Sequence, residues 1–230
     1  MENKEIIFRT GYDNFLSKRY DAAIEQFSKY INKFPKDKNI ISVYYLFGES
    51  YYGKGEYEKA INIFHTILNN YQPTEILIRK TNFSLAYAYI SNNQIEKAMD
   101  EFAHIVSNYP FTTEGLLSQL KLGDCFYDKQ EFEKASEVYN KVYNKVIENK
   151  AITSSLPDIG NRLAASLFRL GEFNKSIKIY EEIISKFPEH EKISSIKINL
   201  AIINLYIRNF NKSREILFEI TNPRFAGPKT

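Results

Sequence analysis

The chain has 230 residues, of which 43% are hydrophobic and 26% charged, and its formal net charge is +3. This balance is typical of a folded protein and excludes an intrinsically disordered one. Lys and Arg alternate with Asp and Glu, whereas a nucleic-acid-binding surface needs clustered basic residues. No apolar run approaches the ~18 residues of a membrane span, so we expect neither a nucleic-acid partner nor a transmembrane segment.

The N-terminal segment has no basic stretch followed by an apolar core, and no nearby cysteine for lipidation. As written, the sequence predicts a cytoplasmic protein, and a periplasmic one if a signal peptide has been removed. The single cysteine, Cys125, excludes an internal disulfide and a cysteine-rich metal site.

A block of ten residues recurs along the chain, as in GEYEKAINIF at 55–64 and QEFEKASEVY at 130–139. Aligning the copies on their small residue gives spacings of 37, 38, 37, 41 and 37 residues. A fixed period of this size is typical of a solenoid of stacked repeats. The aligned small residues are Ala23, Ala60, Ala98, Ala135, Ser176 and Ser213.

Each unit also carries a small residue twelve positions earlier and a large apolar residue four positions later. Apolar residues recur at three- and four-residue steps on both sides of a short polar link, which predicts two antiparallel helices. The helices approach closely where the small residues face each other, and proline ends the second helix in most units. The earlier small residues are Gly11, Gly48, Ala86, Gly123, Ala164 and Ala201; the large residues are Phe27, Phe64, Phe102, Tyr139, Tyr180 and Leu217.

These landmarks resemble the tetratricopeptide repeat over residues ~4 to 222. The resemblance implies an all-α fold, a right-handed superhelical solenoid of about six helical hairpins. Here the period is 37 residues rather than the usual ~34. That longer spacing, with Phe-Pro or Tyr-Pro at 34–35, 109–110 and 187–188, is similar to bacterial envelope proteins of the outer-membrane-assembly lipoprotein and Tol-Pal coordinator types.

We expect one continuous solenoid domain followed by a C-terminal tail at 223–230, where Phe225 could fold back on the last unit. The fourth unit departs from the pattern, because no proline follows Tyr139 at the expected distance and four extra residues are present. Either its second helix is longer or a looser joint divides four units from two. We favour the longer helix, with a Ser-rich link at 153–157. The expected units lie near 4–37, 41–74, 79–112, 116–149, 157–190 and 194–222.

No pattern indicates catalysis or a cofactor. The sequence contains no glycine-rich phosphate loop, nucleophile elbow or paired-carboxylate motif. His65, His104 and His190 have no ligand cluster at fixed spacing, so we expect structural or surface roles for them and a buried structural thiol at Cys125. We therefore predict a protein that is not an enzyme and holds no cofactor or metal.

In such solenoids the first helices line a concave wall that binds extended or helical peptides. Tyrosine is favoured at interfaces because one end is apolar and the other forms hydrogen bonds. The alternative is that many of these aromatic residues only pack between neighbouring helices. The candidate groove residues are Phe8, Tyr12, Phe15, Tyr45, Glu49, Tyr52, Phe83, Tyr87, Tyr127 and Phe168.

The leading functional hypothesis is a scaffold that binds a protein or peptide segment in this groove, within a bacterial envelope or motility assembly. The alternative is a structural subunit that self-associates end to end through its terminal repeats. Family members that grip a partner's C-terminal carboxylates use Lys and Asn on the same wall. The matching positions here are Phe8, Tyr12, Tyr45 and Glu49, so we do not expect an acidic tail as the ligand.

Overall fold

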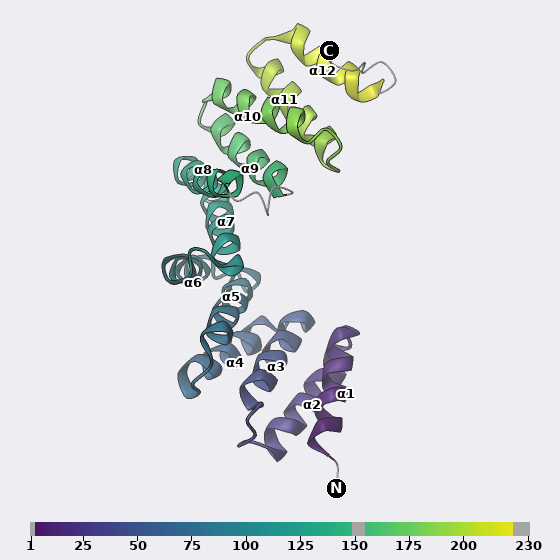
Figure 1. Ribbon diagram of the computed structural model, residues 1–230, viewed down its shortest axis with the longest axis vertical. Coiled ribbons are helices and arrows are strands. Elements are labelled where there is room, and N and C mark those ends of the chain that lie inside the picture. The colour runs from purple at the N-terminus through teal and green to yellow at the C-terminus, as the bar shows by residue number, and fades with distance from the viewer. Residues whose placement is uncertain (1–2, 149–154, 223–230) are drawn as a thin grey trace. The chain divides into compact units, whose positions relative to one another are not determined.

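The computed structural model describes residues 3–148 and 155–222. In these ranges the chain forms twelve α-helices and no strand, as the sequence predicts (Figure 1). The first six helices are α1 (Lys4–Leu16), α2 (Tyr20–Lys33), α3 (Ile40–Lys54), α4 (Tyr57–Asn70), α5 (Glu75–Ser91) and α6 (Ile95–Asn108). The others are α7 (Thr113–Asp128), α8 (Phe132–Glu148), α9 (Leu156–Arg169), α10 (Phe173–Lys186), α11 (Ile193–Tyr206) and α12 (Phe210–Thr221).

The chain divides into two compact units, residues 1–118 and 119–230, and the division falls inside α7. The sequence analysis instead expects one continuous domain, and weighs a joint only after the fourth repeat. The longer second helix expected there is present, because α8 has 17 residues and α2, α4, α6 and α10 have 14 each. Residues 153–154 of the expected Ser-rich link, like the tail at 223–230 with Phe225, lie outside the described residues. Pro157, expected in the link, lies in the first turn of α9, where a missing N–H costs nothing.

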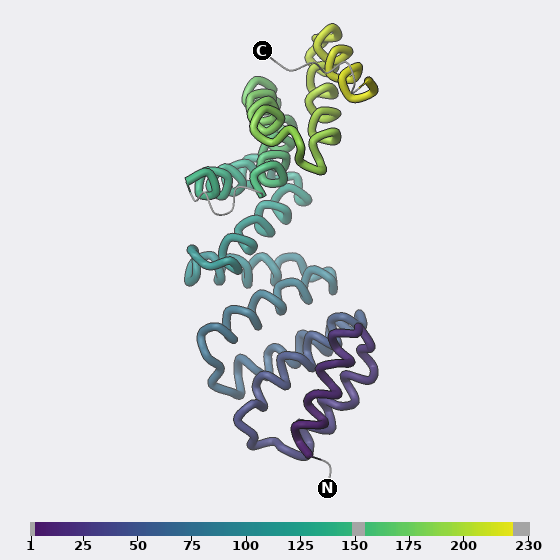
Figure 2. The backbone as a smooth tube through the Cα atoms, turned by 45° about the vertical axis from the view of Figure 1, so that its right-hand side comes forward, coloured from purple at the N-terminus to yellow at the C-terminus, as the bar shows by residue number. Residues whose placement is uncertain are grey.

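Within each unit, helical hairpins stack side by side (Figure 2). In the first unit α2 packs on α3 and α4 packs on α5, and the first helices also touch, α1 with α3 and α3 with α5. In the second unit α8 packs on α9, α10 packs on α11, and α9 touches α11. The first helices of neighbouring hairpins therefore share one wall in each unit.

The close contact between the two helices of a hairpin is confirmed. A Cβ atom on Gly48 would lie 2.6 Å from the Phe64 ring, and one on Gly123 would lie 2.5 Å from the Tyr139 ring. Where the second small residue is Ser176, its hydroxyl donates a hydrogen bond of 2.6 Å to the Ala164 carbonyl. The small residues therefore let the helices approach and let a large ring fill the space beside them.

The turns between paired helices share one backbone feature. A residue with φ between 56° and 87° stands five positions before the aligned small residue of every hairpin. Left-handed backbone suits glycine, yet only two of the six positions have it, so the others accept some strain. The common turn explains why the two helices of each hairpin keep the same spacing. These residues are Lys18, Gly55, Asn93, Gln130, Gly171 and Arg208.

His65 and Cys125 are both at least partly buried. His65 shares a hydrogen bond of 2.7 Å with the Tyr89 hydroxyl, and burial lowers the pKa of its imidazole. Cys125 is buried as a free thiol. Across residues 3–148 and 155–222, no three His, Cys, Asp or Glu side chains gather as metal ligands. No helix of the same ranges is long and apolar enough to cross a membrane.

Candidate partner-binding site on the first helices

Five of the ten predicted groove residues surround one hollow in the first unit. Its volume is about 440 Å³, and it lies between α3 and α5. We call it the aromatic hollow. The lining residues are Tyr45, Glu49 and Tyr52 from α3, and Phe83, Ser84 and Tyr87 from α5.

Helical spacing explains why these side chains meet. Tyr45, Glu49 and Tyr52 follow one another at steps of four and three residues, so they share one face of α3. Two hydroxyl contacts then tie this face to α5. The Tyr45 hydroxyl lies 3.1 Å from the Ser84 hydroxyl, and the Tyr52 hydroxyl lies 3.3 Å from that of Ser91.

The second helices hold the rings of the aromatic hollow in place. Tyr45 packs against Phe64 with ring centroids 6.1 Å apart. Phe83 and Tyr87 both meet the edge or face of Phe102, at 6.2 and 5.8 Å. Because Phe64 and Phe102 are fully buried, the groove rings pack against fixed aromatic rings of the hairpin cores.

Glu49 is the one charged residue that lines the aromatic hollow. Burial raises the pKa of its carboxyl group, and hydrogen bonding from Ser84 offsets only part of that effect. Burial and the Glu49 charge together raise the pKa of Tyr45 to about 12, so this phenol stays neutral at physiological pH. Across the described ranges, no Lys, Arg or His forms an ion pair with Glu49. Arg79 on α5 is paired with Glu114 at 3.0 Å.

The other predicted groove residues lie outside the aromatic hollow. On α1, Phe8 packs on Phe27 and Tyr30, Tyr12 stacks on Phe8, and Phe15 meets Tyr20. Tyr127 and Phe168 belong to the second unit, where they pack against Phe132 and Phe173 respectively.

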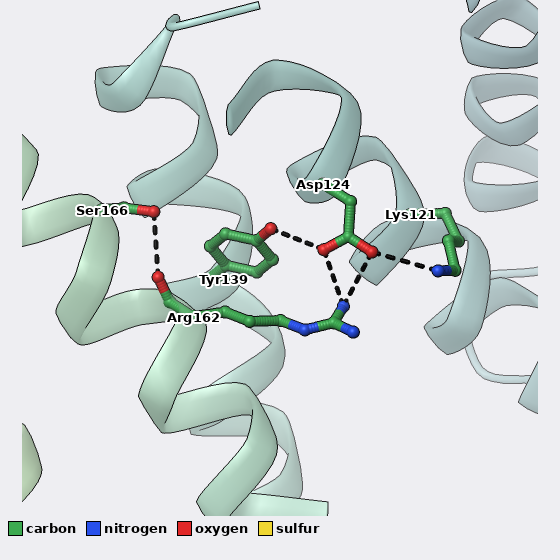
Figure 3. Close-up of polar contacts among 5 residues, drawn as sticks. All are labelled: Lys121, Asp124, Tyr139, Arg162 and Ser166. Atoms are coloured by element: carbon green, nitrogen blue, oxygen red, sulfur yellow. Dashed lines mark hydrogen bonds and ion pairs between the residues drawn. The ribbon is translucent and has the colours of Figure 1, made fainter. Parts of the chain in front are cut away.

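The second unit contains a carboxylate at the same repeat position as Glu49. Asp124 on α7 stands eleven residues before its aligned small residue, as Glu49 does. Figure 3 shows that three donors converge on it. The Tyr139 hydroxyl donates at 2.7 Å, the Arg162 Nη1 atom lies 2.7 and 2.9 Å from the two carboxylate oxygens, and the Lys121 Nζ atom lies at 3.1 Å.

The neighbours of the two carboxylates also occupy equivalent positions. Arg162 stands fourteen residues before Ser176, and Ser84 stands fourteen residues before Ala98. Asp124 therefore faces arginine on the next first helix, and Glu49 faces serine. Ser84 and Arg162 are not among the groove residues predicted from the sequence. Both pairs, Glu49 with Ser84 and Asp124 with Arg162, can be found in the sequence. The comparison needed is between the residue eleven before the small residue of one repeat and the residue fourteen before that of the next repeat.

Five segments of the chain match the tetratricopeptide repeat family, at residues 5–37, 42–73, 82–112, 117–146 and 162–190. Together they cover more than half of the chain. The chain belongs to the tetratricopeptide repeat family. The sixth predicted unit, 194–222, lies outside these five segments and folds as the α11–α12 hairpin.

The chain is similar to tetratricopeptide repeat protein 21B of Xenopus laevis, with 24% identity over 168 residues. The match covers 71% of this chain and 11% of that protein, so the chain spans about a tenth of the length of this curated relative.

Solved structures share the fold. The tetratricopeptide repeat sensor protein of Pyrococcus horikoshii, a signal transduction ATPase with numerous domains, matches with a TM-score of 0.79 and 16% identity, over 96% of this chain and 36% of that one. A repeat protein of Cytophaga hutchinsonii matches with a TM-score of 0.75 and 19% identity, over 95% and 81%. BtubC of P. vanneervenii matches with a TM-score of 0.70 and 14% identity, over 96% and 94%.

Proposed function

We propose that this protein is a non-catalytic scaffold that binds a segment of a partner protein on the first-helix wall of its first unit, at the aromatic hollow. One observation carries the proposal. Four aromatic rings line the same hollow as a carboxylate that has no cation partner among residues 3–148 and 155–222. Amphipathic tyrosines around a single polar anchor are the composition of an interface rather than of a closed core.

The family supports this function, because tetratricopeptide repeats are typically interaction scaffolds without catalytic activity. The charge of the aromatic hollow supports the choice of partner. Glu49 repels an acidic C-terminal segment and a phosphate backbone, so we propose a protein segment and not a nucleic acid. The 37-residue period and the Phe-Pro or Tyr-Pro ends support a bacterial envelope or motility assembly as the setting.

Site-specific crosslinking tests the proposal. Lys80 is exposed on α5, about one turn before Phe83, and we would replace it with a photo-crosslinking amino acid. Tyr52→Ala combined with Tyr87→Ala removes two rings of the hollow. We expect this double variant to lose the adduct formed at position 80 in cells of the source organism, while its circular dichroism stays helical.

The matched control removes two apolar side chains that do not line the hollow. Ile76 and Phe111, 58% and 89% exposed, lie in the same unit. Ile76→Ala combined with Phe111→Ala should keep the adduct. If the tyrosine double variant keeps its adduct at full yield, the hollow is not where the partner binds.

A second candidate function is end-to-end self-association, and the last hairpin favours it. The large residue four positions after the aligned small residue is at most 2% exposed in the first five repeats, but Leu217 is 44% exposed. Leu217 and its apolar neighbours on α11 and α12 surround a hollow of about 400 Å³. Exposed apolar patches of this kind are typical of interaction surfaces. The neighbours are Leu205, Phe210 and Phe218, which are 54%, 59% and 55% exposed.

Sedimentation velocity over a wide concentration range tests this candidate. Self-association through the last hairpin predicts a sedimentation coefficient that rises with concentration, and Phe210→Ser combined with Leu217→Ser should abolish the rise. A chain that remains monomeric at high concentration would remove this candidate function.

A further inference from the structure

We propose that the aromatic hollow binds the side chain of one arginine in the partner segment, with Glu49 as the counter-ion of the guanidinium group. This inference rests on the proposed function, since it assigns the chemistry of the bound segment.

The second unit shows which group pairs with a carboxylate at this repeat position. There the carboxylate at the eleventh position meets Arg162 from the next first helix, and Arg162 Nη1 contacts both Asp124 oxygens. In the first unit the equivalent neighbour is Ser84, whose hydroxyl lies against Tyr45. A serine cannot neutralise a carboxylate. Glu49 is therefore a carboxylate at a position that is ion-paired in the second unit, and it has no cationic partner among the described residues.

The lining favours arginine over other cations. A guanidinium group is planar, stacks on aromatic faces and donates two parallel hydrogen bonds to a carboxylate, while a lysine ammonium is compact and more strongly hydrated. Tyr45, Tyr52, Phe83 and Tyr87 provide the rings and attract a cation through their electron-rich faces. The volume of about 440 Å³ lies near the lower end of ligand pockets, ~300–1,000 Å³, and so suits one long side chain.

The electrostatics of the hollow agree with this assignment. The titratable groups that line the hollow beside Glu49 are the phenols of Tyr45, Tyr52 and Tyr87. Glu114, whose charge also raises the pKa of Tyr45, is paired with Arg79. None of them is an unpaired cation. Burial raises the pKa of Glu49, so binding a guanidinium group favours the ionised carboxylate and releases a proton. The affinity for arginine should therefore fall as the pH is lowered through the pKa of Glu49.

Small arginine mimics test the proposal without knowledge of the partner. We would titrate N-acetyl-arginine amide, its neutral isostere N-acetyl-citrulline amide, and N-acetyl-lysine amide into the full chain. Chemical shifts of the tyrosine rings would report binding. We expect saturable millimolar binding of the arginine amide, with citrulline and lysine amides weaker by about tenfold or more.

Two variants separate the hollow from the paired carboxylate of the second unit. Glu49→Gln should reduce arginine binding to the citrulline level, and Asp124→Asn should leave it unchanged. Equal binding of arginine and citrulline, tighter binding of lysine, or full arginine affinity in Glu49→Gln would each overturn the proposal. Failure of the proposed function looks different: the arginine amide then still binds, but the adduct at position 80 survives the tyrosine substitutions.

Discussion

Two carboxylates at the same repeat position behave differently in the two units. Asp124 in the second unit accepts hydrogen bonds or ion pairs from Tyr139, Arg162 and Lys121. Glu49 in the first unit has tyrosines and a serine around it, and burial raises the pKa of its carboxyl group. The two carboxylates share a repeat position, and the difference lies in the residues around them. Arg162 and Tyr139 in the second unit correspond to Ser84 and Phe64 in the first.

The comparison separates a structural use of the first-helix wall from a binding use. Asp124 connects three helices of its own unit, which stabilises the stacking of α7, α8 and α9. Glu49 has no cation beside it among the described residues, and burial disfavours the ionised form of its carboxyl group, so a charge there destabilises the fold. Natural chains tolerate such a conflict mainly where it serves a function. The predictions below test this contrast, beginning with the largest expected effect.

The largest effect should come from filling the close contact beside the paired carboxylate. Gly123→Leu forces Tyr139 to move, since even a Cβ atom would lie 2.5 Å from its ring. Overpacking costs about 1–3 kcal/mol, and Tyr139 also loses its hydrogen bond to Asp124, which adds ~1 kcal/mol. Gly48→Leu displaces Phe64, which has no such bond, and should cost less. Urea unfolding of both variants measures this difference, and an unchanged transition in either would show that the contact is not tight.

Removing the guanidinium from the second unit should have a medium effect. Arg162→Ser leaves Asp124 with Tyr139 and Lys121 as partners. Because the arginine and aspartate side chains are 38% and 25% exposed, we expect a loss of about 1–2 kcal/mol, less than for a fully buried pair. Lys134→Ser is the control, since it breaks a surface pair with Glu131 at the same change of charge. It should cost less than ~0.5 kcal/mol. Equal losses in thermal unfolding would contradict a structural role for Arg162.

Neutralising the other carboxylate should have the smallest effect, with the opposite sign. The pKa of Glu49 is raised in the folded state, so the folded chain binds this proton more tightly than the unfolded one. Stability therefore decreases as the pH rises from the unfolded pKa, near 4.5, through the folded one. Glu49→Gln lacks this loss and should be more stable at neutral pH by up to about 1 kcal/mol.

The gain from Glu49→Gln should disappear at acidic pH, where the wild-type carboxyl group is protonated. Melting temperatures of both proteins, measured between pH 4 and pH 8, give the comparison. A lower melting temperature for Glu49→Gln at neutral pH would mean that the fold already stabilises the Glu49 charge.

The local geometry of each hairpin follows from the sequence because it depends on short spacings. Gly123 and Ala135 stand twelve residues apart, and this separation alone predicts a close helix contact with Tyr139 beside it. The extra length of α8 is likewise predicted from the absence of a proline at the usual distance. Six repeats of the same spacing make these predictions mutually consistent.

Features that depend on the neighbouring hairpin could be predicted less well. Glu49 is predicted on the wall, but its isolation depends on Ser84, a residue 35 positions away on another helix. Leu217 carries the landmark spacing and is still exposed, because burial needs a neighbour to cover it. The division within α7 has no counterpart in the repeat pattern, since Gly123 keeps its usual spacing to Ala135 across this helix.

The most direct measurement is a double-mutant cycle between Ser84→Arg and Glu49→Gln in the first unit. Ser84→Arg places a guanidinium group where the second unit has Arg162. We predict that it stabilises the chain by about 1 kcal/mol when Glu49 is present and not in the Glu49→Gln background, and that it prevents the arginine amide from binding. Strictly additive effects on the free energy of unfolding, with arginine binding retained, would contradict the claim that Glu49 is an unpaired carboxylate that binds a guanidinium group.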